Sequence, residues 1–157
     1  MQSDDAGSET TLVQAIRDRE QLCAAVGLLN ANVDGPDRFA SPFDLAGMHE
    51  CDVVAGDRKR GAYSLVELED ATPLSIFEIT PNTPYWSTRF NRGYSQVLDW
   101  LCLLDGLEHT PQFREIWGDE LPSFVGVLIA GRSASLTPAG YNRLRWRIPS
   151  TASPTTN

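Results

Sequence analysis

Three acidic residues, Asp52, Glu67 and Glu69, lie within two short, mostly apolar segments on either side of a polar turn. Side chains alternate between the two faces of a β-strand, so Glu67 and Glu69 share one face. Neighbouring carboxylates on adjacent strands repel one another unless a cation compensates their charge. Mg²⁺ binds a few carboxylates together with water and phosphate oxygens. The three acids therefore predict a site for a divalent cation, with a solvated sheet edge as the alternative.

Two predicted strands carry these acids. Residues 50–55 and 62–69 have the composition of strands, and the glycine-bounded polar turn 56–61 between them predicts an antiparallel hairpin. Residues 43–48 are a candidate for a preceding strand. The hairpin has to bring Asp52 next to the two glutamates for a cation site to form.

The register of the hairpin decides whether Asp52 joins the other acids. If the turn pairs Ala55 with Ala62, Asp52 lies opposite Leu65 and diagonal to Glu67. A register changed by two residues would place Asp52 directly opposite Glu67, whereas a change by one residue would send it to the other face. The sequence leaves these registers open.

A polar stripe on a predicted helix over residues 88–104 is the second candidate feature. Arg89, Arg92 and Gln96 are spaced i, i+3 and i+7, which places them on one side of the helix, and Gly106 is its expected end. Arginine and amide side chains on one helix face can contact the phosphate oxygens of a nucleic acid. A solvated helix face is the alternative.

The remaining segments predict the elements that position these residues. Helices are predicted over 11–30, 111–117 and 138–148, and a continuous apolar run over 124–130 is typical of a strand that is buried on both faces. The elements follow the order α-β-β-β-α-β. This order predicts an α/β fold with a mixed central sheet of about four strands, flanked by helices.

Length and composition favour a single domain over residues 10–148. A chain of 157 residues with 41% hydrophobic and 22% charged residues is globular and can bury a core without disulfides. Residues 1–9 and the Ser/Thr/Pro-rich residues 149–157 are expected to be mobile. No segment approaches the ~18 apolar residues of a membrane span. The three cysteines lack metal-site spacing, so we expect a cytoplasmic protein with buried, reduced thiols.

The net charge of −8 is distributed unevenly along the chain. Residues 1–57 hold 3 basic and 11 acidic residues and account for the whole excess, because residues 58–157 hold 10 of each. From Gly131 onward the chain has four arginines and no acid. The acidic total argues against a nonspecific nucleic-acid coat protein, but its distribution does not exclude a nuclease.

Several short segments, taken in order, carry a family resemblance. They are Asp52, Val66-Glu67-Leu68-Glu69, Tyr94-Ser-Gln96-Val-Leu-Asp99-Trp100, Val127-Leu-Ile-Ala-Gly131-Arg132 and Leu144-Arg-Trp-Arg147. Together they resemble the nuclease domain of the Shedu anti-phage defence family, which belongs to the restriction-endonuclease-like, PD-(D/E)XK superfamily. The resemblance covers residues 35–148.

The resemblance implies a restriction-endonuclease-like core that cleaves DNA phosphodiesters with Mg²⁺ or Mn²⁺. On this match, Asp52 is the first metal-binding acid, Glu67 is the acid of the E-x-K element, and the backbone carbonyl of Leu68 completes the metal ligands. Gln96 matches the glutamine of the following helix and would position water or phosphate. DNA is the implied partner, and no membrane is involved. The resemblance leaves open whether the chain forms a homo-oligomer and which DNA it prefers. It also leaves open whether it nicks or cuts both strands and what activates it.

One position departs from the usual pattern of such nucleases. Glu69 stands where they carry a lysine that orients the attacking water and stabilises developing negative charge. Glu69 could instead be a further metal ligand or act on the water. The chain's one lysine, Lys59, lies at the predicted hairpin tip with Arg58 and Arg60, where these cations either contact the DNA backbone or form a solvated turn. The alternative function is therefore a degenerate nuclease fold that binds nucleic acid or a protein partner without cleavage.

Overall fold

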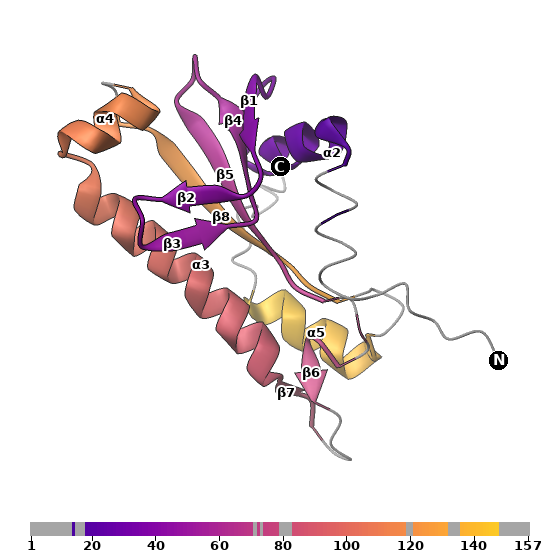
Figure 1. Cartoon of the computed structure of the whole chain (residues 1–157). Helices are drawn as coiled ribbons and strands as arrows, with labels where there is room; N and C mark the ends of the chain where they lie inside the picture. The colour runs from indigo at the N-terminus through magenta and orange to yellow at the C-terminus, as the bar shows by residue number, and fades with distance from the viewer. Residues whose placement is uncertain are drawn as a thin grey trace, which may run out of the picture.

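The computed structural model describes the larger part of the chain, namely residues 14, 18–70, 72, 74–78, 83–118, 121–131 and 136–147. These residues form an α/β fold in which helices flank a four-stranded mixed sheet, as the element pattern predicts (Figure 1). The terminal segments 1–9 and 149–157, for which mobility is predicted, lie outside the described residues. No helix within the described part of the chain is long and apolar enough to span a membrane.

The central sheet has the strand order β1-β4-β5-β8. β1 (Arg38–Ala40), β4 (Val53–Asp57) and β5 (Ala62–Leu68) are antiparallel neighbours, and β8 (Ser123–Ile129) lies parallel to β5. β8 is one of the two edge strands of this sheet, and most of its residues are only half-buried. The prediction of a strand buried on both faces is therefore confirmed only in part: Phe124 and Leu128 pack against one core cluster and Val127 and Ile129 against the other, but the edge position leaves them half-buried.

Helices cover both faces of the sheet. α2 (Glu20–Val26) lies against β4, and α3 (Thr88–Leu107) lies against β5 and β8. The other elements are the 3-10 helix η1 (Gly27–Leu29), α4 (Pro111–Trp117), α5 (Pro138–Arg147) and two small hairpins, β2–β3 (Phe43–Leu45 and His49–Cys51) and β6–β7 (Phe77–Glu78 and Tyr85–Trp86).

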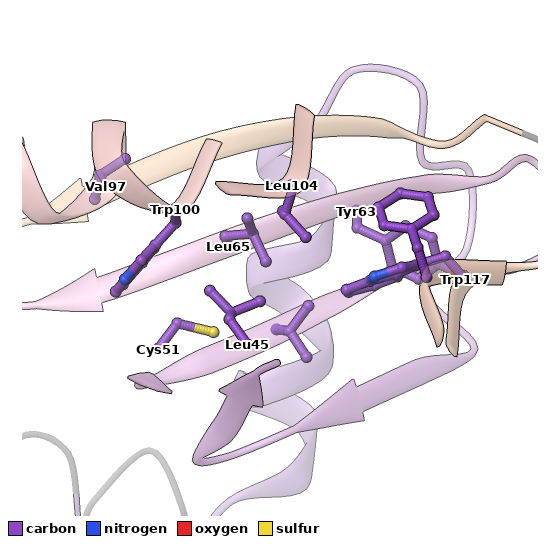
Figure 2. Packing of buried hydrophobic residues seen from close by; sticks show 10 residues of the cluster. Leu45, Cys51, Tyr63, Leu65, Val97, Trp100, Leu104 and Trp117 are labelled. Atoms are coloured by element: carbon purple, nitrogen blue, oxygen red, sulfur yellow. The ribbon is translucent and has the colours of Figure 1, made fainter. Parts of the chain in front are cut away.

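Alternation along β5 sends its side chains into two separate clusters. Tyr63 and Leu65 belong to the main core together with Trp100 of α3 (Figure 2). Val66 belongs to a second cluster, against which Val26 of α2 packs. Odd-numbered residues of β5 therefore face α3, and even-numbered residues face α2.

The segment between residues 38 and 55 differs from the prediction. The first strand of the sheet is β1 rather than residues 43–48, because β2 pairs with β3 in a separate hairpin. The predicted strand 50–55 is interrupted at Asp52, which lies between β3 and β4. A strand as short as β1 has too few residues for an alternating pattern to mark it in the sequence.

The β4–β5 register selects one of the arrangements that the sequence leaves open. Val53 pairs with Val66, and the other pairs of the hairpin keep the same register. Continued by one residue, this register sets Asp52 opposite Glu67. This register differs by two residues from the one that pairs Ala55 with Ala62.

The turn is shorter than predicted because β4 extends through Gly56 and Asp57, which leaves residues 58–61 as the turn. An added Cβ on Gly56 would lie 2.2 Å from the carbonyl oxygen of Ala62 and 2.5 Å from the ring of Tyr63. Glycine is therefore needed here for the close approach of the two strands. The sequence pattern instead suggests a glycine that bounds the turn.

α3 begins where the sequence predicts and runs past its predicted end. The Ser87 hydroxyl caps the helix by accepting a hydrogen bond from the amide of Phe90 at 3.0 Å. Gly106 lies within the helix, which ends at Leu107, so the prediction that Gly106 stops it is wrong. Gly106 does not adopt the left-handed φ of a glycine stop, and no atom lies within 4 Å of an added Cβ there.

Two of the remaining helix predictions are confirmed, and the third is confirmed in part. The predicted helices over 111–117 and 138–148 are confirmed by α4 and α5. In the described part of the predicted 11–30 helix, α2 is followed by the 3-10 turn η1, which ends at Leu29. The segment between β5 and α3 contains the β6–β7 hairpin.

Candidate active site

A cleft of about 740 Å³ opens between the β2–β3 hairpin, the C-terminal end of β5 and the first half of α3. Figure 1 shows the hairpin and α3 on the same side of the sheet. All four predicted catalytic residues line this cleft, together with two of the predicted nucleic-acid contacts. The full lining consists of Met48, His49, Glu50, Asp52, Glu67, Glu69, Thr88, Arg89, Arg92 and Gln96.

Asp52 is held in the cleft by both its backbone and its side chain. Its carboxylate oxygen Oδ2 accepts a hydrogen bond from the backbone amide of Leu68 at 2.8 Å. Its carbonyl oxygen accepts a hydrogen bond from the Ser41 hydroxyl at 2.6 Å. These bonds fix Asp52 across from Glu67, at the point where the chain leaves β3 and enters β4.

Glu67 and Glu69 follow the odd-numbered alternation of β5 toward α3. Only 9% of Glu67 and 7% of Glu69 is exposed. Buried carboxylates are costly unless other groups compensate their charge, so two of them on one face mark a special environment. The fold tolerates this placement because the strand around them is anchored on both sides, by β4 and by β8.

Glu69 lies directly against α3 at Gly93. An added Cβ on Gly93 would be 3.0 Å from Glu69 Oε1 and 2.9 Å from Leu128 Cδ1. The backbone amide of Glu69 also donates a hydrogen bond to the carbonyl of Ile129 at 2.8 Å. A glycine at position 93 therefore makes room for the Glu69 carboxylate in the wall of the cleft.

The polar stripe of α3 faces the cleft, where a phosphate-contacting face would have to lie. Arg89, Arg92 and Gln96 all line it. Arg89 forms an ion pair with Asp70, with 2.5 Å between Nη1 and Oδ2. No described acidic residue forms an ion pair with Arg92. The two arginines therefore differ in their electrostatic surroundings.

Asp70 has a pKa below its ordinary value. Partial burial of its carboxyl raises the pKa, but several donors outweigh that effect. The Thr72 backbone amide donates to Oδ1 at 2.7 Å, Arg89 contributes its positive charge, and the Ser75 hydroxyl donates at 3.3 Å. Asp70 is thus an ionised anchor for Arg89 at neutral pH.

His49 and Glu50 are cleft residues that no sequence motif marks. Both precede the interruption at Asp52 and lie on β3, whose pairing with β2 carries them away from the central sheet and to the mouth of the cleft. The prediction of one continuous strand over residues 50–55 does not include this change in the direction of the chain. Their closeness to Asp52 in sequence was the available indication.

The basic turn at residues 58–60 does not belong to the cleft. It lies at the opposite end of β5 from Glu67 and Glu69, about 20 Å away at ~3.3 Å per strand residue. Arg60 forms an ion pair with Asp34, and the Arg58 amide donates to Asp37 at 2.9 Å. Lys59 is exposed in this turn. The structure therefore places Arg58, Lys59 and Arg60 apart from the candidate active site.

A second hollow of about 400 Å³ lies on another part of the surface, between β1 and α4. Its wall includes the aromatic residues Phe43, Tyr63 and Trp117. Asp37 is the one carboxylate among its described lining residues, and this group already accepts a hydrogen bond from Arg58. The cleft that holds four carboxylates is the better candidate for chemistry.

The donor set of the cleft fits a hard divalent cation. Among the described residues, no three His, Cys, Asp or Glu side chains are grouped as a metal site. Mg²⁺ in phosphoryl-transfer sites is commonly held by one or two carboxylates, with waters and substrate phosphates completing its shell. Asp52 and Glu67, placed opposite one another and next to the Leu68 peptide, meet that smaller requirement.

The negative charge of the cleft also acts on Cys51, which lies in the core next to Asp52. Burial raises the pKa of the Cys51 thiol to about 12, and the charges of Asp52, Glu67 and Glu50 contribute to the increase. Cys51 is fully buried, as predicted. Cys102 is exposed on α3, so the prediction of a buried thiol is wrong there, and the side chain of Cys23 lies outside the described residues.

Comparisons with known proteins identify the family of the chain. A search among curated proteins and a search among solved structures each found no match. A protein-family model described as "Shedu protein SduA, C-terminal" matches residues 8–153. The match spans nearly the whole chain and contains every residue of the cleft. The chain therefore belongs to the family of Shedu protein SduA C-terminal domains.

Proposed function

We propose that this chain is a divalent-metal-dependent endonuclease domain that cleaves DNA phosphodiesters in defence against phages. Membership of the Shedu family supports the defence context. The observation that carries the proposed chemistry is the single cleft that gathers Asp52, Glu67, Glu69 and Gln96. Acids from two segments of the chain, the β3–β4 junction and the end of β5, converge there beside a helix face that carries arginines.

The four predicted catalytic residues of the cleft each have a role in the proposed reaction. Asp52 and Glu67, with the Leu68 carbonyl, would hold Mg²⁺ or Mn²⁺, which supplies Lewis-acid activation of the phosphate and lowers the pKa of a water. Gln96 positions water or a phosphate oxygen through its side-chain amide. Glu69 accepts a hydrogen bond from the attacking water and orients it, because its carboxylate is fixed against Gly93.

The decisive test is the substitution Glu67→Gln, which keeps the shape of the side chain and removes its charge. Cleavage of supercoiled plasmid DNA should require Mg²⁺ or Mn²⁺ and fall by at least about 100-fold in this variant, since metal activation contributes several kcal/mol to such reactions. Glu115→Gln, an exposed residue on α4, is the matched control and should cleave like the wild type. Full activity of Glu67→Gln would refute the assignment.

A binding module without nuclease activity is the second candidate function. It is favoured by one observation: Glu69 stands at the position of the usual catalytic lysine, and the chain's one lysine lies in the distant β4–β5 turn. In that case the wild-type chain would retain DNA or a protein partner and leave the plasmid intact. Neither Mg²⁺ nor Mn²⁺ would then raise its melting temperature.

A further inference from the structure

The cleft is lined by more acidic than basic side chains, and its two arginines differ in their ion-pair partners. Its lining includes four carboxylates and two guanidinium groups. Hydrolysis of a phosphodiester builds up further negative charge on the phosphate oxygens, and enzymes stabilise that charge with donors that are already in place. The ammonium that usually does this is missing, because its position is taken by Glu69.

Arg89 is committed to another partner. Its guanidinium is 2.5 Å from Asp70, and Asp70 is itself held by Thr72 and Ser75. A carboxylate this close offsets part of the positive charge that an arginine presents to other groups. Arg89 therefore anchors the start of α3 on the segment that follows β5.

Arg92 is in a different position. It lines the cleft, its side chain is exposed, and no described acidic residue forms an ion pair with it. It directly precedes Gly93, the residue against which Glu69 Oε1 lies. It is also four residues before Gln96, so both side chains lie on the same face of α3.

Arg92 lies next to the point where α3 meets strand position 69, the position of the usual lysine. The strand position that normally carries the lysine points at α3 and meets it at Gly93. Arg92 occupies the neighbouring position on the helix, and its side chain lines the same cleft as Glu69. A guanidinium offers paired donors that match two phosphate oxygens, which a carboxylate cannot offer.

We propose that Arg92 is a catalytic residue of the proposed nuclease reaction and supplies, from α3, the positive charge that the usual lysine supplies from the strand. In the reaction, the water oxygen bonds to phosphorus and the bond from phosphorus to the leaving ester oxygen breaks. The water proton passes to Glu69 and on to solvent, and the leaving oxygen takes a proton from solvent. Arg92 changes no covalent bond and donates hydrogen bonds to the non-bridging phosphate oxygens.

Single-turnover cleavage and DNA binding, measured separately, test this role. With saturating enzyme and Mg²⁺, Arg92→Ala should cut about 100-fold more slowly than the wild type. Its affinity for the same DNA, measured in Ca²⁺ so that binding is read without turnover, should change by less than about 3-fold. Arg92→Lys should recover part of the rate. Arg114→Ala, at an exposed position on α4, is the matched control and should leave both quantities unchanged.

Two further measurements separate a direct contact from a general electrostatic effect. Added methylguanidine should restore part of the rate of Arg92→Ala, because it can occupy the space of the missing group. Replacing one non-bridging oxygen of the scissile phosphate with sulfur should slow the wild type more than Arg92→Ala. An unchanged melting temperature shows that the variant is folded.

The outcomes distinguish this proposal from the proposed function on which it rests. If the wild type cuts, Glu67→Gln does not, and Arg92→Ala cuts as fast as the wild type, only the role of Arg92 is overturned. A rate loss that saturating enzyme abolishes would also overturn it, because Arg92 would then be a DNA-binding contact alone. A wild-type chain that binds DNA and never cuts it in Mg²⁺ or Mn²⁺ overturns both proposals.

Discussion

At the scale of single residues, the cleft depends on a contact between a strand side chain and a helix glycine. Glu69 is nearly fully buried, and its carboxylate reaches α3 only because Gly93 has no side chain. Glycine inside a helix costs about 1 kcal/mol relative to alanine. Its presence in the middle of α3 is therefore explained by the room it leaves for Glu69 and Leu128.

Gly93→Ala tests this contact. The new methyl group would lie 3.0 Å from Glu69 Oε1 and 2.9 Å from Leu128 Cδ1, so the carboxylate has to move. We expect cleavage to fall by about 10-fold or more, since small displacements of catalytic groups have effects of this size. Gly106→Ala is the matched control on the same helix, where no atom lies within 4 Å of the added Cβ. It should raise the free energy of unfolding by roughly 0.5–1 kcal/mol and leave the rate unchanged. Equal rates in the two variants would contradict this role of Gly93.

At the scale of elements, the position of the polar stripe follows from how closely α3 packs on β8. An added Cβ on Gly126 of β8 would lie 2.3 Å from Val97 Cγ1, so the Val97 side chain packs directly on the backbone of the strand there. Val97 directly follows Gln96, and Trp100, about one turn further on, packs in the main core (Figure 2). The packing of α3 therefore sets the distance of Gln96 and Arg92 from the carboxylates of β5.

Gly126→Ala should push α3 away from the sheet. Overpacking of this kind costs roughly 1–3 kcal/mol of unfolding free energy, which a urea titration would measure. Gly35→Ala is its control, in a loop where nothing lies within 4 Å of the added Cβ. Because the helix carries part of the cleft, cleavage by Gly126→Ala should also fall under conditions in which the variant is fully folded. Unchanged stability in this variant would show that α3 can shift at little cost.

At the scale of the whole molecule, the buried thiol next to the cleft makes stability depend on pH. The pKa of Cys51 is raised from 9.0 to about 12 in the folded chain, first by burial and then by the nearby acids. Above pH 9 an unfolded thiol loses its proton while the folded one keeps it, so the unfolded state binds fewer protons. The contribution of Cys51 is therefore fully present below pH 9 and is lost progressively as the pH rises toward 12.

Melting temperatures between pH 7 and pH 10 should show this effect. The wild type should lose more stability over this range than Cys51→Ala, which lacks the titrating group. Alkylation followed by mass spectrometry gives a second measurement in the native protein. The exposed Cys102 should react with iodoacetamide at pH 8, whereas Cys51 should react only after unfolding. Rapid labelling of Cys51 in the folded chain would show that it is not enclosed as the structure describes.

Local patterns in the sequence determine much of this protein. Alternation along residues 62–69 is sufficient to put Glu67 and Glu69 on one face, because the side chains of a strand repeat every two residues. Helical spacing likewise places Arg89, Arg92 and Gln96 on one stripe, and the element order predicts the mixed four-stranded sheet that the structure confirms. These features depend only on neighbours in the chain, so composition and spacing are enough to find them.

The tertiary structure decides what these features do together. The register that sets Asp52 opposite Glu67 depends on how tightly Gly56 lets two strands approach, and the same close packing brings Glu69 to Gly93. The interruption at Asp52 carries His49 to the cleft, and the length of β5 keeps Lys59 away from it. Contacts between segments far apart in the sequence are set by the packing of whole elements. The local periodicity of the sequence does not predict that packing. For the same reason, only the folded chain distinguishes the paired Arg89 from Arg92.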